Sequence, residues 1–158
     1  MTDNAVHLAG IEHELMLFSR YHLRPQHYAG TVLERSAYVL MSRLELVDPM
    51  TLKELSTALR LDASTIHRQV GVLLNRGLVA YAAVAPGEVA RRISPTAEGL
   101  AELAATRTTF VAGLGLVVEN WPAAKRGQFL DLLLEFNQDV ERLEGAPWPR
   151  ATDTTRSN

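Results

Sequence analysis

The spacing of apolar residues predicts a largely helical chain. Near the N-terminus, apolar side chains recur every three or four residues, which is typical of an amphipathic helix and places one over residues 5–20. This stripe consists of Leu8, Ile11, Leu15 and Phe18. A second stripe consists of Leu33, Ala37, Leu40, Leu44 and Val47. Its helix should end before Asp48-Pro49, because proline disfavours helical backbone in the preceding residue.

Two short helices with marked starts follow. Thr51-Leu-Lys-Glu54 has the form of a capping box, in which a hydroxyl and a carboxylate satisfy backbone N–H groups at a helix start. This helix should run to about Leu59. Asp62 is a suitable N-cap for a fourth helix, Ala63 to Arg76, which should close at Gly77. Two short capped helices joined by a tight connection predict a helix-turn-helix.

A β-hairpin and two longer helices are predicted in the second half. Residues 78–85 and 89–93 predict the two strands, separated by a turn at 86–88. Ser94-Pro95-Thr96 should start the next helix, with a hydroxyl cap and a proline in its first turn, and Trp121-Pro122 should end it. Its apolar face consists of Leu100, Leu103, Phe110, Leu114 and Val117. The last helix carries Phe129, Leu133, Phe136, Val140 and Leu143, close to the period of a packed helical seam.

These elements predict a mainly α (α+β winged-helix) fold with two functional parts. A winged helix-turn-helix domain over 31–95, which we call the reading head, would bind DNA. The helices over 5–20 and 96–144, which we call the stem, carry more apolar faces than one small domain can cover, so they should form a dimer. The polar, proline-containing tail 145–158 is expected to be disordered.

Composition limits the function classes. The chain has 158 residues, 47% hydrophobic, and no cysteine, which fits one domain and excludes disulfides, thiolate metal sites and thiol oxidation as a signal. It begins without a basic, apolar leader, and no run approaches the roughly 18 apolar residues of a membrane span, so we expect a cytoplasmic protein. The net charge is −2, yet residues 53–92 carry a basic excess of three, as phosphate contact by this part would require.

The helical wheel of 63–76 separates a buried from an exposed face. Ile66, Val70 and Leu73 cluster on one side and predict the buried face. The expected DNA contacts lie opposite and on the flanks, and are Ser64, Thr65, His67, Arg68, Gln69, Asn75 and Arg76. Arg68 can donate two hydrogen bonds to guanine or to a phosphate, and Ser64 and Thr65 are short donors. The alternative is an ordinary solvated helix face.

The run from Leu61 to Val79 resembles the recognition-helix signature of the MarR family. Ser94-Pro-Thr-Ala-Glu-Gly99 is similar to that family's Leu-Thr-x-x-Gly helix start, with proline in the leucine position. The resemblance covers roughly residues 5–145. It implies a dimer whose first and last helices interlock, two winged domains, and often a small-molecule pocket between stem and reading head.

The predicted wing departs from that family's pattern. The family's wing tip usually carries an Asp-x-Arg whose arginine enters the minor groove, whereas this chain has Pro86-Gly-Glu-Val-Ala90. The rising strand also lacks charge. Arg91 and Arg92 are therefore the expected DNA contacts of the wing, although one of them could equally be a structural ion-pair partner.

Other candidate sites are weaker. His22, His27, Tyr28 and Tyr38 form a polar and aromatic group in and beside the first connector, and are either an effector pocket or ordinary packing. The five histidines lack the spacing of helical metal ligands, so neither a metal nor a cofactor is expected. The chain has no phosphate loop, zinc-protease motif or nucleophile elbow, so an enzyme is not expected.

The sequence therefore predicts a homodimeric DNA-binding transcription regulator, expected to be a repressor. Its two recognition helices would read a pseudo-palindromic operator in double-stranded DNA at positions about 34–36 Å apart, with release by a small-molecule effector. The alternative is a helical dimer of the same fold that binds a protein or a ligand and has weak or no DNA affinity, which the depleted wing favours.

Overall fold

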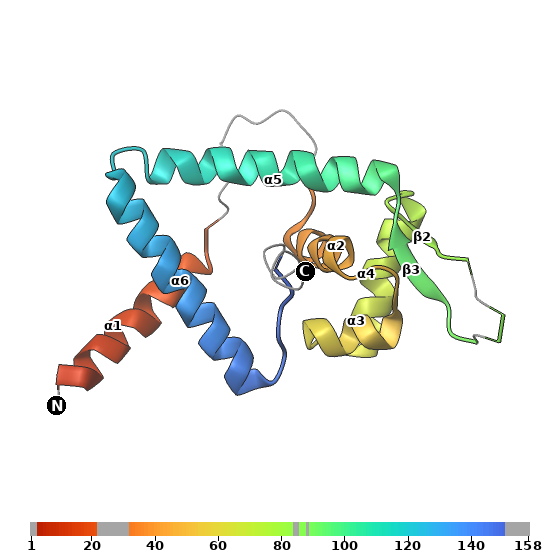
Figure 1. Ribbon diagram of the computed structural model, residues 1–158, viewed down its shortest axis with the longest axis horizontal. Helices are drawn as coiled ribbons and strands as arrows, with labels where there is room; N and C mark the ends of the chain where they lie inside the picture. Colours follow the sequence, from red (N-terminus) through yellow and green to blue (C-terminus); the bar gives the residue numbers. More distant parts are fainter. Residues whose placement is uncertain (1–2, 22–31, 84–85, 88, 151–158) are drawn as a thin grey trace, which may run out of the picture.

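The computed structural model describes residues 3–21, 32–83, 86–87 and 89–150. The elements, in chain order, are α1 (Asp3–Phe18), α2 (Arg35–Leu46), β1 (Met50–Thr51), α3 (Leu52–Leu59), α4 (Ala63–Asn75), β2 (Val79–Tyr81), β3 (Arg92–Pro95), α5 (Ala97–Val117) and α6 (Ala123–Glu144). The reading head gathers along one half of α5, and α1 and α6 lie toward its other end (Figure 1). The predicted fold class, mainly α with a winged helix-turn-helix, is confirmed.

The caps of the helix-turn-helix form as the sequence predicts. The Thr51 hydroxyl accepts a hydrogen bond from the Glu54 backbone N–H at 3.1 Å, and the Glu54 carboxylate accepts one from the Thr51 N–H at 2.8 Å. Helix α3 ends at Arg60 in the left-handed conformation, and Asp62 caps α4. Gly77, at φ +70°, turns the chain out of α4 toward β2. This left-handed position explains why glycine follows the helix.

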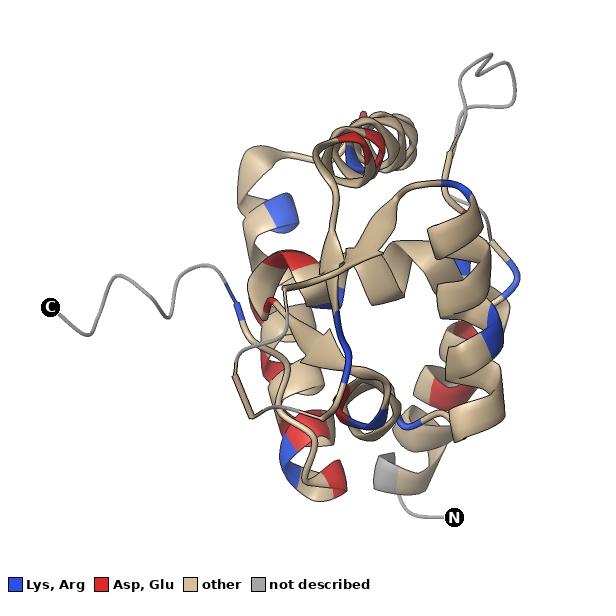
Figure 2. Ribbon diagram, turned by 90° about the vertical axis from the view of Figure 1, so that its right-hand side faces the viewer, with Lys and Arg blue, Asp and Glu red and all other residues tan. Residues whose placement is uncertain are grey.

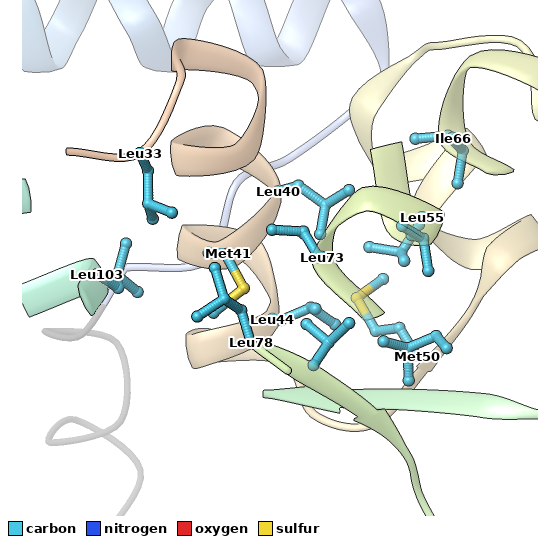
Figure 3. Close-up of a cluster of buried hydrophobic side chains, with 13 residues drawn as sticks. Leu33, Leu40, Met41, Leu44, Met50, Leu55, Ile66, Leu73, Leu78 and Leu103 are labelled. Carbon is cyan, nitrogen blue, oxygen red and sulfur yellow. The ribbon is translucent and has the colours of Figure 1, made fainter. Parts of the chain in front are cut away.

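The core of the reading head joins α2, α3 and α4 (Figure 3). Leu40 and Leu44 of α2 meet Leu55 of α3 and Ile66 and Leu73 of α4, and all five are fully or almost fully buried. Burial of each such side chain contributes about 1.5–3 kcal/mol. The two short helices are therefore fixed by α2, since each is shorter than an isolated stable helix.

The small sheet has the order β1-β3-β2, and β3 is antiparallel to both neighbours. Ile93, which is fully buried, lies opposite Met50 on one side and Tyr81 on the other. The predicted hairpin is present, but its descending strand runs over Arg92–Pro95 rather than 89–93. Strand β1 was not predicted, because two residues are too few to show a β-type alternation.

The start of α5 also differs from the prediction. Ser94 and Pro95 belong to β3, and Thr96 is the N-cap, so the helix begins at Ala97. The reason is a double hydrogen bond of the Thr96 hydroxyl, which accepts from the Gly99 N–H at 3.0 Å and donates to the Gly77 carbonyl at 2.7 Å. The Ser94 hydroxyl instead donates to Asp48.

The first half of α5 packs on the reading head. The buried residues of α5 as a whole are Gly99, Leu103, Thr106, Thr109 and Gly113. Helix α5 lies against α2, and the Thr106 hydroxyl accepts a hydrogen bond from the Leu33 N–H at 3.0 Å. On length and hydropathy alone, α5 could cross a membrane, contrary to the expectation that no segment approaches a span. A single helix of this kind is weak evidence of a membrane span, and α5 packs against α2 of the reading head.

The remainder of the stem has its apolar side chains exposed. Helix α6 contains no buried residue among its described positions 123–144. Large apolar side chains that are more than one-third exposed include Leu8, Ile11, Leu15 and Phe18 of α1, Leu114, Leu116 and Val117 of α5, and Phe129, Leu130, Leu132, Leu133 and Phe136 of α6. Apart from the part of α5 that packs on the reading head, the apolar faces predicted for the stem thus have little cover within the described part of one chain.

The segment that follows α6 contacts the end of that helix and α2. The Glu141 carboxylate accepts hydrogen bonds from the Trp148 backbone N–H at 3.1 Å and from the Arg150 guanidinium at 2.5 and 3.0 Å. The Arg43 guanidinium lies 5.3 Å from the centroid of the Trp148 ring. Residues 145–150 of the predicted tail thus lie against α6 and Arg43, and residues 151–158 lie outside the described residues.

We expect Gly99→Ala to destabilise the fold by about 3 kcal/mol, since overpacking of this kind costs up to that order. A Cβ at Gly99 would lie 2.0 Å from the Leu78 carbonyl oxygen, which is backbone and has little room to move. The control is Gly115→Ala in the same helix, where an added Cβ meets nothing within 4 Å. Urea unfolding should show Gly115→Ala unchanged or more stable. Equal stability of the two variants would contradict this account of the junction.

Candidate nucleic-acid interface

Helix α4 presents the exposed face that the wheel predicts. Ile66, Val70 and Leu73 are buried, as expected. The predicted positions Ser64, His67, Arg68 and Asn75 are exposed. Helices α3 and α4 pack against each other, so α4 is the second helix of a helix-turn-helix with one open polar side. That is the helix which such motifs place in the major groove.

The Asp62 carboxylate organises the start of α4. It accepts hydrogen bonds from the Thr65 N–H at 2.8 Å, the Thr65 hydroxyl at 2.7 Å and the Ser64 hydroxyl at 2.5 Å. The bonds from Ser64 and then Thr65 hold the pKa of Asp62 well below its ordinary value. Because both hydroxyl protons point to Asp62, the two side chains predicted as donors to DNA are already donating. Their hydroxyl oxygens can still accept hydrogen bonds, for example from the amino groups of bases.

Arg68 is a cation of this face without a partner among the described residues. Its side chain is exposed, and within the described ranges it forms no ion pair or hydrogen bond. A guanidinium offers five N–H donors in a planar fork that matches two acceptors at once. The guanidinium that the sequence predicts as a donor to guanine or phosphate is therefore both accessible and chemically available.

Two other predicted positions on α4 are used within the fold. The Arg76 guanidinium forms an ion pair with Glu102 of α5 at 2.5 Å, so it contacts α5. Gln69 is half-buried, and its side-chain oxygen is buried without a hydrogen-bond partner in the described part of the chain. The wheel assigned both to the flanks of the groove, but it could not show that α5 and the domain interior lie there.

The two wing arginines have different environments. Arg92 lies 3.0 Å from the Glu54 carboxylate and 3.2 Å from the Pro49 carbonyl, and so braces β3 against the start of α3. This is the structural ion pair that the sequence left open as the alternative. Arg91 is exposed and lies over the Tyr81 ring at 5.0 Å. Of the predicted pair, Arg91 is the one directed to solvent.

The turn of the wing carries little charge in its described part. Pro86 and Gly87 are exposed, and Val89 is 98% exposed. Figure 2, which views the molecule from the wing side, shows basic positions interspersed with acidic ones. An electrostatic contact with a phosphate backbone would therefore depend on a few individual cations. Lys53 of α3 is such a cation, and it was not among the predicted DNA contacts. It is exposed and forms no ion pair among the residues described. A helical wheel of α3 could have placed it on the exposed face.

The predicted effector pocket is only partly visible. His22, His27 and Tyr28 lie outside the described residues. The Tyr38 ring packs edge-to-face on Phe110 at a centroid distance of 5.0 Å, which fits the ordinary-packing alternative. A cavity of about 540 Å³ lies elsewhere, between α2, β1, α3, β3 and residues 145–147. Over the ranges that are described, no three His, Asp or Glu side chains cluster as metal ligands.

The Asp62 cap makes a pH-dependent prediction. Asp62→Ala should lower the thermal unfolding midpoint at neutral pH, whereas Asp62→Asn, which keeps an acceptor oxygen, should lower it less. The folded-state pKa of Asp62 is depressed, so its stabilisation is present above the ordinary value of about 3.9 and is lost as the pH falls toward the folded pKa. The difference in unfolding midpoint between wild type and Asp62→Ala should become smaller below about pH 4. A gap that stays constant down to about pH 2.5 would contradict this.

Comparison with known proteins yields fold neighbours only. No protein-family model matches the sequence, and no curated protein matches it. A MarR family protein from Bacillus stearothermophilus superposes with a TM-score of 0.66 at 21% identity, covering 89% of this chain and 98% of the other. The PcaV transcriptional regulator from Streptomyces coelicolor, in complex with its natural ligand, superposes with a TM-score of 0.60 at 19% identity, covering 89% and 99%.

Wild-type MarR from E. coli, in its apo form, is a third such neighbour. It superposes with a TM-score of 0.58 at 15% identity over 66% of this chain and 78% of that protein. At these identities the likeness concerns the backbone arrangement. The chain has the winged helix-turn-helix fold of MarR-family transcriptional regulators.

Proposed function

We propose that this protein is a homodimeric, DNA-binding transcription regulator of the MarR family that reads its operator with α4. The observation that carries the proposal is the exposed polar face of α4, on which Arg68 has no partner among the described residues. The fold supports it, because the neighbours of this chain are transcriptional regulators. Ser64, Thr65, His67 and Asn75 are the proposed accompanying contacts, with Arg91 from the wing.

Dimerisation is proposed through the stem, residues 5–20 and 96–144. Leu116 of α5 and Leu130 and Leu132 of α6 are each about two-thirds exposed in one chain. These two helices and α1 expose many further apolar side chains. Monomeric proteins rarely expose contiguous apolar surface of this extent. A second copy of the same helices would cover it, and a two-fold dimer would place two α4 helices on one face of DNA, about one turn apart.

The regulatory role proposed is repression in the cytoplasm, relieved by a small molecule. The PcaV neighbour contains its natural ligand, which supports an effector for this chain too. The chain has no cysteine, so thiol oxidation is not the signal. A gel-shift against DNA upstream of the protein's own gene tests the proposal, and we expect a shift that weakens steeply with salt.

A second candidate is a dimer of this fold with weak or no DNA affinity. It is favoured by the engagement of Arg76 and Arg92 within the fold and by the carboxylate of Asp62 at the start of α4, since a carboxylate there repels phosphate. Absence of any salt-sensitive shift in the same experiment would favour this candidate.

We expect Arg68→Ala to weaken binding to the specific site by about 1–3 kcal/mol and to relax preference at one base position, because a bidentate contact to guanine is lost. Fluorescence anisotropy against a panel of single-base variants of the site measures this. Arg126→Ala, an exposed arginine on α6, is the matched charge control and should bind as wild type. Equal weakening of Arg68→Ala on all sequences would show that Arg68 holds phosphate only.

The wing should act differently. Arg91→Ala is expected to flatten the slope of log affinity against log salt by up to about one, as for a single phosphate contact, with the order of preferred sites unchanged. Arg92→Ala should mainly lower folding stability, since Arg92 braces β3 on Glu54. A reordered site preference in Arg91→Ala would mean that the wing reads bases.

The exposed apolar surface of the stem predicts that the protein is a dimer at micromolar concentration. Leu132→Glu should dissociate or unfold it, because a charge would enter an apolar interface. Gln138→Glu introduces the same charge about 120° away around α6 and should leave the dimer intact. Sedimentation velocity with circular dichroism separates dissociation from unfolding. A well-folded wild-type monomer at micromolar concentration would refute the dimer and its two half-sites.

A further inference from the structure

The segment that follows α6, residues 145–150, joins the two parts of the molecule, and we call it the strap. It leaves α6 at Gly145 and runs back toward α2 (Figure 1). The Glu141 carboxylate accepts hydrogen bonds from the Trp148 N–H at 3.1 Å and from the Arg150 guanidinium at 2.5 Å. The strap is thus attached to the last turn of the stem helix α6.

The strap and the end of α6 also contact the reading head. The Arg43 guanidinium of α2 lies 5.3 Å from the centroid of the Trp148 ring, and its Nη1 donates to the Pro147 carbonyl at 3.5 Å. Arg60, in the turn between α3 and α4, forms an ion pair of 2.9 Å with Glu144, the last residue of α6. The far end of the stem is therefore tied to α2 and to the turn of the helix-turn-helix.

The indole of Trp148 lies against a poorly hydrated charge. Trp148 is half-buried, and the Nε of Arg43 is buried without a hydrogen-bond partner among the described residues. Burial lowers the pKa of Arg43, as expected when water does not fully solvate the guanidinium. A cation–π interaction is stronger when the cation is desolvated. Trp148 therefore stabilises the Arg43 charge in a place where water and hydrogen bonds do so only in part.

The strap and α5 hold α2 on opposite sides. Met41 faces Gly99 of α5, because its Cε would lie 2.9 Å from a Cβ at that glycine. Arg43 follows two residues later and so points about 160° away around the helix, at about 100° per residue. Helix α2 is thus held between the first half of α5 and the strap. Two attachments on opposite sides restrict the rotation of a rigid body more than one attachment does.

The attachment by the strap depends on few side chains. A cavity of about 540 Å³ lies between the strap, where Pro147 lines it, and the reading head, where Val47 lines it. The two surfaces therefore do not pack closely over this area. A single substitution in the contact between Arg43 and Trp148 can thus release the strap while the core of the reading head stays intact.

We propose that Trp148 is a positioning residue for DNA reading, which acts through Arg43 to hold the reading head against the end of the stem. In a dimer joined by the stem, this attachment would fix the distance and the angle between the two α4 helices. Two recognition helices must match the spacing of two half-sites on the duplex, so the strap would determine which spacing the dimer accepts. The inference rests on the proposed dimer and requires no contact of the strap with DNA.

Fluorescence quenching tests the contact itself, without DNA. Trp121→Phe leaves Trp148 as the one tryptophan of the chain. In this background we expect Arg43→Gln to shift the emission of Trp148 to longer wavelength and to remove its protection from acrylamide. The control is Arg142→Gln, which removes an exposed charge of α6 and should change neither. Unchanged quenching in Arg43→Gln, or an equal response of the control, would overturn the contact.

The distance between the two α4 helices tests the positioning role. Because the chain has no cysteine, Val72→Cys supplies one nitroxide site per subunit on an exposed position of α4. Double electron–electron resonance should give a narrow distance distribution, which Trp148→Ala broadens and Trp148→Phe, which keeps an aromatic face, restores. Arg43→Gln is a second variant and should broaden the distribution likewise. Circular dichroism checks that each variant keeps the reading head folded.

The outcomes separate the strap from the dimer. A distribution that stays narrow in folded Trp148→Ala and Arg43→Gln, or that broadens equally in Trp148→Phe, would overturn the positioning role and leave the dimer standing. Absence of a dipolar signal in the labelled parent would instead refute the dimer, and the role in spacing with it. The quenching result would in that case still decide whether the strap contacts α2.

Discussion

The arrangement depends on the close approach of α5 to the chain that leaves α4. Gly99 lies so near the Leu78 carbonyl that no Cβ fits between them, and the Thr96 hydroxyl ties the helix start to Gly77. Leu78 and Val79 are buried immediately beyond. The end of the recognition helix, the base of the wing and the start of the stem are therefore held at one point. This gives a physical reason for the Thr-x-x-Gly pattern at the start of α5.

That junction also governs the proposed function. If two stems form a dimer, the distance between the two α4 helices follows from how each α4 is fixed to its own α5. The Arg76–Glu102 ion pair adds a second link between the same two helices.

Local signals explain what the sequence predicted. The capping box at Thr51, the cap at Asp62 and the buried stripe of α4 are each determined within a few residues, and all three are confirmed. The roles of Arg76 and Arg92 were not predictable in this way, because their partners are 26 and 38 residues distant. The contacts of Trp148 and Arg150 depend on Glu141, which lies in the last turn of α6. Polar composition alone therefore suggested disorder.

Within the candidate site, the sequence predicted the exposure of side chains better than their hydrogen bonding. Arg68 was found from the wheel and is exposed and unpaired among the described residues. Ser64 is exposed and Thr65 is half-buried, and the hydroxyl groups of both donate to Asp62. Whether a cap residue accepts hydrogen bonds from the two hydroxyl groups beside it depends on side-chain rotamers. The spacing of apolar residues gives no information about these rotamers.

The central claim is that a dimer reads DNA with two copies of α4. Hydroxyl-radical footprinting of the complex on DNA upstream of the protein's own gene tests it most directly. The account predicts two protected segments related by a two-fold axis, on one face of the duplex and about 10 base pairs apart. A single protected segment, or uniform weak protection without any preferred position, would contradict it.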